Sequence, residues 1–259
     1  MKSTSLILIT LTLITGCISA KNTTFDYMTS VTETSVLKSE DNETEMHFRI
    51  YSPKLVKGEK YPVCIYLHDE GETGNDNVAQ MTNGFDRIVK FIEDNDARVI
   101  AIAPQCPKGV QWKDKEMIET IHDLIASLVE KEEVDHNRVY LTGYGMGGEG
   151  VWNFALEYPL CASAFAPVCG GCPISKTTSV KKVPVDLGEV SIWAIHYLDD
   201  RVRTPDLSKK ILRLVWVQSV ALARMTEFPS GGHTPEIYSN ENFMWWLFST
   251  RRDVMPYFQ

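Results

Sequence analysis

The run Gly143-Tyr144-Gly145-Met146-Gly147 has the glycine spacing of a sharp turn that can present a catalytic side chain. In a Gly-x-Ser-x-Gly turn, the middle residue is a serine whose hydroxyl attacks a carbonyl carbon. Here the middle residue is Gly145, which has no side chain. The spacing therefore predicts a turn built to present a nucleophile, at which the nucleophile is missing.

A strand and a helix must hold such a turn in place. Residues 138–141, Arg-Val-Tyr-Leu, are typical of a short buried strand, and residues 151–157 are typical of a helix. Similar patterns predict further strands over 46–51, 63–67, 99–103, 162–168, 192–195 and 224–228. Apolar residues at helical spacing predict helices over 85–92, 118–128 and 242–248. This alternation predicts an α/β protein with a mostly parallel sheet and helices on both faces.

The composition favours one ordinary globular domain. The 259 residues are 44% hydrophobic and 23% charged, enough for one substantial core. A formal net charge of −8 without a basic cluster disfavours nucleic acid or an anionic membrane as a partner. We expect residues 46–259 to form the domain. Residues 21–45 are polar and rich in threonine, and they are expected to form a poorly ordered arm or a loose edge strand.

Residues 1–20 have the pattern of a signal peptide. Lys2 gives a positive start, and the apolar stretch that follows is too short to span a bilayer in the mature protein. Cleavage after Ala20 would release a secreted or extracytoplasmic protein without a transmembrane segment. The run Ile14-Thr15-Gly16-Cys17 is similar to a bacterial lipobox, and processing there would leave a lipid anchor on Cys17 at the cell envelope. We favour release, because the lipobox match is short.

The cysteines do not indicate a metal site. After Cys17 an odd number of cysteines remains, so at least one is unpaired. Cys64 and Cys161 lie in apolar runs, which favours buried free thiols. Cys169 and Cys172 have C-x-x-C spacing, but no second pair stands at zinc-ligand spacing, so a redox or metal site is disfavoured. We expect no metal and no cofactor.

Several further runs carry a family resemblance that extends from residue 46 to the C-terminus. They are Tyr61-Pro62-Val63, Leu67-His68, Gly71 to Asn77, Ala103 to Pro107 with Trp112, Arg138 to Gly143 with Met146-Gly147-Gly148, Val168 to Gly171, and Ile192 to His196. In this order and spacing, the chain resembles α/β-hydrolases of the secreted carboxylesterase type. This is the phospholipase/carboxylesterase and dienelactone-hydrolase-like group, with feruloyl-esterase and polyester-depolymerase relatives. The resemblance implies the α/β-hydrolase fold.

The resemblance also implies a catalytic triad in the chain order Ser, Asp, His. Carried over by position, the nucleophile falls on Gly145, the acid on Asp200 and the base on His233. Acyl transfer needs a hydroxyl or thiol that attacks, a histidine that deprotonates it and an aspartate that orients the histidine. Two of these three groups are present, and the attacking group is absent.

The predicted oxyanion loop departs from the family pattern as well. Where the family has His-Gly, this chain has His68-Asp69, followed by Glu70. A carboxylate at this place would oppose a developing oxyanion. The other presumed donor, the N–H of Met146, is retained.

The rim of the predicted site also differs from the family. Tyr197 replaces a small residue after His196, and Arg203-Thr204 replaces the usual apolar-Pro ending of that loop. We therefore expect a rim that has changed in several places.

Three functions from different classes remain open. The first is a secreted pseudoenzyme that lacks serine-hydrolase activity and binds a partner, or a small ester or carbohydrate-linked ligand. The second is an ester hydrolase in which His233 and Asp200 activate a water molecule. The third is a structural extracellular protein without a pocket. Because no nucleophile is present, we favour an inert hydrogen-bonded pair over a reassigned catalytic role for Asp200 and His233.

Overall fold

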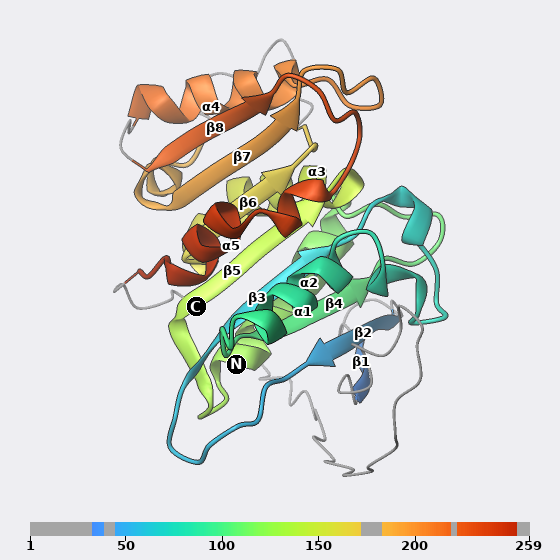
Figure 1. The fold of residues 1–259 in the computed structure, drawn as a ribbon, viewed down its shortest axis with the longest axis vertical. Helices are drawn as coiled ribbons and strands as arrows, with labels where there is room; N and C mark the ends of the chain where they lie inside the picture. Colours follow the sequence, from blue (N-terminus) through green and yellow to red (C-terminus); the bar gives the residue numbers. More distant parts are fainter. Residues whose placement is uncertain (1–32, 39–44, 172–182, 219–221, 253–259) are drawn as a thin grey trace, which may run out of the picture.

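The computed structural model describes residues 33–38, 45–171, 183–218 and 222–252. The predictions for residues 1–20, Cys17 and Cys172 lie outside these ranges. Within them the chain forms an eight-stranded sheet with helices on both faces (Figure 1). The predicted α/β architecture is therefore confirmed.

The strands and helices have the following bounds. The strands are β1 (Glu33–Lys38), β2 (Glu45–Tyr51), β3 (Tyr61–Leu67), β4 (Ile100–Gln105), β5 (Val134–Tyr144), β6 (Ala164–Val168), β7 (Ser191–Tyr197) and β8 (Ala223–Phe228). The helices are α1 (Phe85–Asp94), α2 (Lys115–Val129), α3 (Met146–Glu157), α4 (Asp206–Gln218) and α5 (Glu241–Ser249). All of the predicted strands and helices are present.

The strand order places the ends of β3 and β5 side by side. The order is β1-β2-β4-β3-β5-β6-β7-β8, with β1, β2 and β4 joined by antiparallel pairing and every later pair parallel. Leu67 on β3 pairs with Gly143 on β5. Because parallel strands end at the same edge of a sheet, the loop after β3 meets the glycine turn after β5. The strand β1 lies within the polar segment 21–45, where it forms an edge strand on β2.

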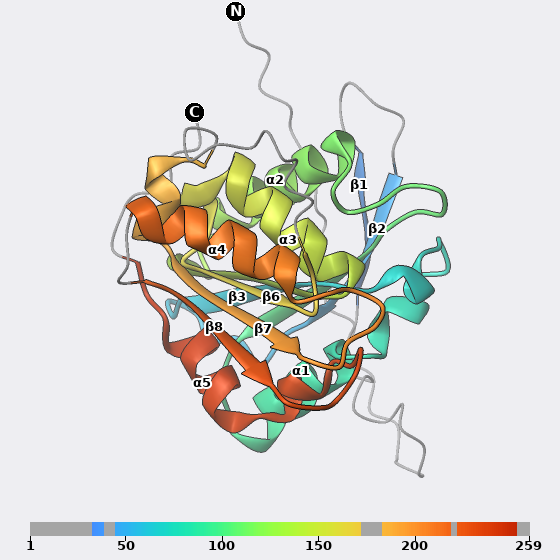
Figure 2. The same ribbon diagram turned by 90° about the horizontal axis from the view of Figure 1, so that it is seen from above.

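Both faces of the sheet are covered, which explains the continuous apolar runs in the strands. Figure 2 shows α2, α3 and α4 on one face and α1 and α5 on the other. Alternate residues of β3 serve the two layers: Ile65 packs in the first core cluster and Cys64 and Tyr66 in the second. Cys64 and Cys161 are buried free thiols, as predicted. Among the described residues, no helix is both long and apolar enough to cross a membrane.

The helix α4 is the one element among those described above that the sequence patterns did not anticipate. Its buried residues Ile211, Leu212 and Val215 do recur at helical spacing. The signal was therefore present, but polar residues and exposed apolar ones such as Trp216 and Val217 dilute it.

Close approach of α3 to β3 requires glycine at position 147. A Cβ added to Gly147 would lie 1.8 Å from the carbonyl oxygen of Leu67, so the backbone would have to move. We expect Gly147→Ala to lower the free energy of unfolding by about 2–4 kcal/mol, because overpacking against a rigid backbone is poorly relieved. Urea unfolding would measure this change.

Gly71→Ala is the matched control for this prediction, because a Cβ at Gly71 meets nothing within 4 Å. We expect that variant to stay within about 0.5 kcal/mol of the wild type. Equal stabilities for the two variants would contradict the close packing of α3 on β3.

Candidate active site

The predicted nucleophile turn lies between β5 and α3, as the strand-turn-helix pattern requires. Gly145 has φ +59° and ψ −114°, a backbone conformation that strains any residue with a side chain. Glycine adopts it at little cost. The N–H of Gly145 donates to the carbonyl of Val168, 3.0 Å away, which fixes the turn against β6.

The space above Gly145 is filled by the side chain of Asp69. A Cβ built on Gly145 would lie 2.1 Å from Oδ1 of Asp69 and 2.4 Å from its Cγ. Asp69 follows β3, so the register of β3 with β5 brings its carboxylate to the turn. The place that a nucleophilic side chain would need therefore holds a carboxylate from another element.

The predicted oxyanion-loop residues Asp69, Glu70 and Met146 converge at this point. The Met146 N–H donates to Oδ1 of Asp69 at 2.6 Å. The N–H of Glu70 also favours the charged form of this carboxylate, because it lowers the pKa of Asp69. On its other side, Oδ2 of Asp69 lies 3.4 Å from Nε2 of His233. From the sequence we expect a carboxylate near the position of an oxyanion. In the structure this carboxylate contacts the expected oxyanion donor, the N–H of Met146, directly.

The predicted acid and base are joined by a short hydrogen bond. Nδ1 of His233 lies 2.8 Å from Oδ2 of Asp200. The other oxygen of Asp200 accepts the N–H groups of Val202 and Arg203, each at 2.9 Å. The carboxylate of Asp200 is thus buried and fixed, so it sets the orientation of the imidazole.

The loop that carries His233 has an anchor that sequence reasoning missed. Asp199 accepts the N–H of Gly232 at 2.7 Å and that of Gly231 at 3.3 Å. The only signal in the sequence was a second acid beside Asp200. Asp199 and Asp200 therefore act on the same loop, one on its backbone and the other on its histidine.

The charges at the site favour an imidazolium between two carboxylates. Burial alone would lower the pKa of His233, but its contacts with Asp69 and Asp200 raise it above its ordinary value. Burial alone would raise the pKa of Asp69, but the nearby imidazole of His233 and the N–H groups of Met146 and Glu70 hold it below its ordinary value. The ring of Tyr144 lies 4.7 Å from that of His233 and covers one side of it.

Comparison with solved structures identifies the fold. A thermostable esterase superposes with a TM-score of 0.73 at 27% identity, over 85% of this chain and 63% of its own. The chain has the α/β-hydrolase fold of esterases. A ferulic acid esterase matches with a TM-score of 0.64 at 18% identity, over 84% of this chain and 97% of its own. A mutant feruloyl esterase module from Clostridium thermocellum, complexed with sinapinate, matches with a TM-score of 0.63 at 12% identity, over 85% and 90%.

Comparison of sequences alone does not detect this similarity. No family model matches the chain. No curated protein matches it either. The chain spans 63% of the length of the thermostable esterase.

In this α/β-hydrolase fold, His68 holds the backbone that carries Asp69. Its Nδ1 donates to the carbonyl of Asp69 at 2.6 Å, and its Nε2 accepts the Cys106 N–H at 2.9 Å. Trp112 donates its indole N–H to the carbonyl of His68 at 2.9 Å. Burial lowers the pKa of His68 to about 4, so the ring stays neutral near neutral pH. His68 therefore positions Asp69 and does not face the turn.

The expectation of a changed rim is wrong for Tyr197. This side chain is buried, and a Cβ on Gly231 would lie 2.3 Å from its ring. Tyr197 thus packs against Gly231 in the loop that carries His233. Arg203 does lie at the edge of the site, where its guanidinium binds Glu149 at 3.0 Å. Leu198 and Val202, two residues before and after Asp200 in the sequence, are exposed apolar side chains at 54% and 69% exposure.

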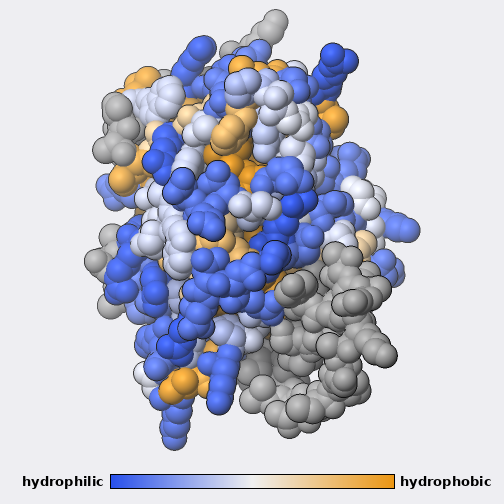
Figure 3. Space-filling model, in the orientation of Figure 1, coloured by the Kyte–Doolittle hydropathy of each residue, from blue (hydrophilic) through white to orange (hydrophobic). Residues whose placement is uncertain are grey.

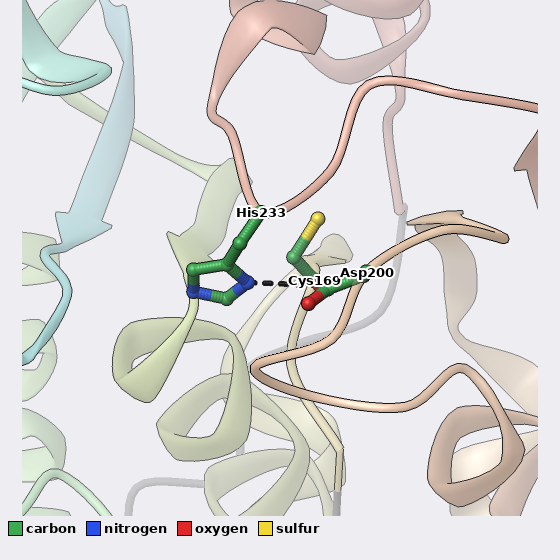
Figure 4. A group of neighbouring side chains, drawn as sticks. All are labelled: Cys169, Asp200 and His233. Carbon is green, nitrogen blue, oxygen red and sulfur yellow. Dashed lines mark hydrogen bonds and ion pairs between the residues drawn. The ribbon is translucent and has the colours of Figure 1, made fainter.

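The site also holds a set of potential metal ligands, Cys169, Asp200 and His233 (Figure 4). One ligand atom from each lies within 4.8 Å of the others. The Asp200–His233 distance of 2.8 Å is that of a direct hydrogen bond. Burial raises the pKa of the Cys169 thiol to about 12, which disfavours the thiolate that a metal requires. The arrangement fits a hydrogen-bonded pair with a thiol beside it better than a metal centre.

Proposed function

We propose that this α/β-hydrolase-fold protein is a pseudoenzyme that lacks serine-hydrolase activity and serves as a binding or interaction protein. The observation that carries the proposal is Gly145 at the turn, with the carboxylate of Asp69 in the space that a nucleophile would need. Acyl transfer through a covalent intermediate requires a hydroxyl or thiol there. The nearby Cys169 does not supply one, because its pKa is raised and its thiol lies on the Asp200 side of His233.

The pattern of residues 1–20 supports a location outside the cytoplasm, either released after Ala20 or anchored at Cys17. The face shown in Figure 3 is mostly hydrophilic, with a smaller apolar area near its centre. Beside the site, the exposed side chains of Leu198 and Val202 would suit the apolar part of a small ester or carbohydrate-linked ligand.

Hydrolysis by a water activated on His233 and Asp200 is the weaker alternative. A general base must be neutral, and the two carboxylates beside His233 raise its pKa and so oppose the loss of its proton. Its Nε2 also faces Asp69 at 3.4 Å, where an activated water would have to lie. The geometry therefore supports a retained pair without a reaction.

A fluorophosphonate probe tests the proposed function. Because the probe reacts only with an activated nucleophile, we expect intact-mass spectra of the wild-type protein to show no adduct. The panel would include an active serine esterase as a positive control, and turnover of small aryl esters would be followed in parallel. Stoichiometric labelling, or ester hydrolysis abolished by His233→Ala, would overturn the proposal.

A further inference from the structure

We propose that Asp69 acts as a tethered ligand: its carboxylate fills an anion-binding hole that is otherwise complete, and a small free carboxylate binds there once the side chain is removed. The inference rests on the proposed absence of a nucleophile at Gly145. It goes further, because it assigns an occupant and a chemical class of ligand to the site.

The first support is the convergence of donors from three parts of the chain. The N–H of Met146 donates to the Asp69 carboxylate at 2.6 Å from the α3 side, and the N–H of Glu70 lowers the pKa of this carboxylate from the β3 side. The imidazole of His233 approaches from the loop after β8, at 3.4 Å from the other oxygen. Two backbone N–H groups and the imidazole of His233 lie around one carboxylate, and such a set of groups favours an anion.

The second support is the position of the carboxylate at the start of α3. The residue that caps this helix is Gly145, which has no side chain to offer the first N–H groups. Asp69 supplies the missing acceptor from a loop 77 residues earlier in the chain. The positive end of the helix dipole adds to the preference for an anion at this place.

The third support is the shape of the space around the carboxylate. Changing Asp69 to glycine removes a carboxymethyl group, which has the size and charge of acetate. The side chain of Asp69 is 21% exposed, so the hole is open to solvent. Because Gly145 contributes no side chain, nothing from the turn would occupy the space that Asp69 vacates. Acetate is therefore the matched free ligand.

The experiment measures chemical rescue of Asp69→Gly. Thermal unfolding is followed while sodium acetate is added, with acetamide as a neutral isostere and sodium chloride as the ionic-strength control. We expect acetate to raise the melting temperature of the variant saturably and to bind at least about tenfold more tightly than acetamide. We expect the wild type to respond to acetate no more than to chloride.

Two further variants make the comparison sharper. In Asp69→Gly/His233→Gln the cationic ring is gone, so the preference for acetate over acetamide should fall. Asp199→Gly is a control that removes another carboxylate, one that accepts the backbone N–H groups of Gly231 and Gly232. This carboxylate lies on the exposed surface, and no cationic ring among the described residues faces it. That variant should show no acetate-specific response.

Equal stabilisation of Asp69→Gly by acetate and acetamide would overturn the inference, as would an equal response of the wild type. If Asp69→Gly does not fold, the test uses the amide proton resonance of Met146 in Asp69→Asn. Loss of the charged acceptor should move this resonance upfield relative to the wild type. An unchanged resonance would overturn the inference. Probe labelling of the wild type would overturn the proposed function alone. An unlabelled wild type without acetate rescue would overturn this inference alone.

Discussion

Replacing Gly145 by serine should leave the protein inactive toward esters, whereas replacing Asp69 by glycine at the same time should produce measurable hydrolysis. The serine Cβ would lie 2.1 Å from Oδ1 of Asp69, so the single variant must displace or distort that side chain. Even then, a carboxylate would remain beside the N–H of Met146, where a transition-state oxyanion must bind. Each donor of an oxyanion hole contributes a factor of about 10²–10³ in kcat, so we expect the double variant to exceed Gly145→Ser by at least about 100-fold.

Turnover of a small aryl ester measures this difference. Fluorophosphonate labelling of the introduced serine in the double variant Asp69→Gly/Gly145→Ser is a second readout. Asp69→Gly alone is the control for the vacated hole without a nucleophile, and it should stay inactive. Adding His233→Ala to the double variant should remove the gained activity, because the serine then lacks its base. A Gly145→Ser variant as active as the double variant would contradict the occupied hole.

The second large effect is a pH-dependent loss of stability in Asp69→Asn. The variant keeps the shape of the side chain and loses its charge, so it removes the ion pair with His233. Near pH 6 we expect the variant to be less stable by about 1.5–3 kcal/mol, the range for hydrogen bonds to charged groups. Urea unfolding of both proteins across the pH range would measure the difference.

The two pKa shifts fix the pH range in which this difference is largest. The pKa of His233 is raised in the folded protein, so its contribution is complete below the unfolded value of about 6.5 and is lost as the pH rises through the folded pKa. The pKa of Asp69 is lowered, so its contribution is complete above the unfolded value of about 3.9 and is lost as the pH falls through the folded pKa. The difference between the proteins should therefore peak between about pH 4 and 6.5.

Comparing two proteins at each pH removes the effects of groups that do not interact with Asp69. His68, whose pKa is about 4, does interact with the charge of Asp69, so the two proteins are compared at pH 5 and above, where this ring is neutral. Asp76→Asn is a suitable control, because its carboxylate binds the N–H groups of Val78 and Ala79 on the surface and faces no histidine. A stability difference between the wild type and Asp69→Asn that stays constant from pH 5 to pH 9 would argue against a charged pair.

The sheet was predictable because its strands are buried on both faces. Continuous apolar runs as short as residues 63–67 and 99–103 are typical of strands that are covered on both faces of a sheet. The helix α4 escaped because exposed apolar residues, Trp216 and Val217, interrupt the contrast between its faces. Hydrophobic patterning therefore predicted strands and helices best where one or both of their faces are uniformly apolar.

The members of the site were predictable from motif and order, but their arrangement was not. The glycine turn, Asp200 and His233 stand at positions that the family order defines, and the structure brings them together. The location of the Asp69 carboxylate depends on the pairing of Leu67 with Gly143 and on a side-chain rotamer, and neither can be read from spacing. The same limit applies to Tyr197, which the sequence placed on the rim and the structure places beneath Gly231.

The hydrogen bonds from Gly231 and Gly232 to Asp199 have a consequence for the history of the site. They tie the loop of the base to the loop of the acid, so Asp200 and His233 keep their alignment whether or not a reaction selects for it. A mutation that disturbed either residue would then lower the stability of the fold. In a chain with glycine at position 145, a requirement for stability alone is therefore enough to preserve the pair.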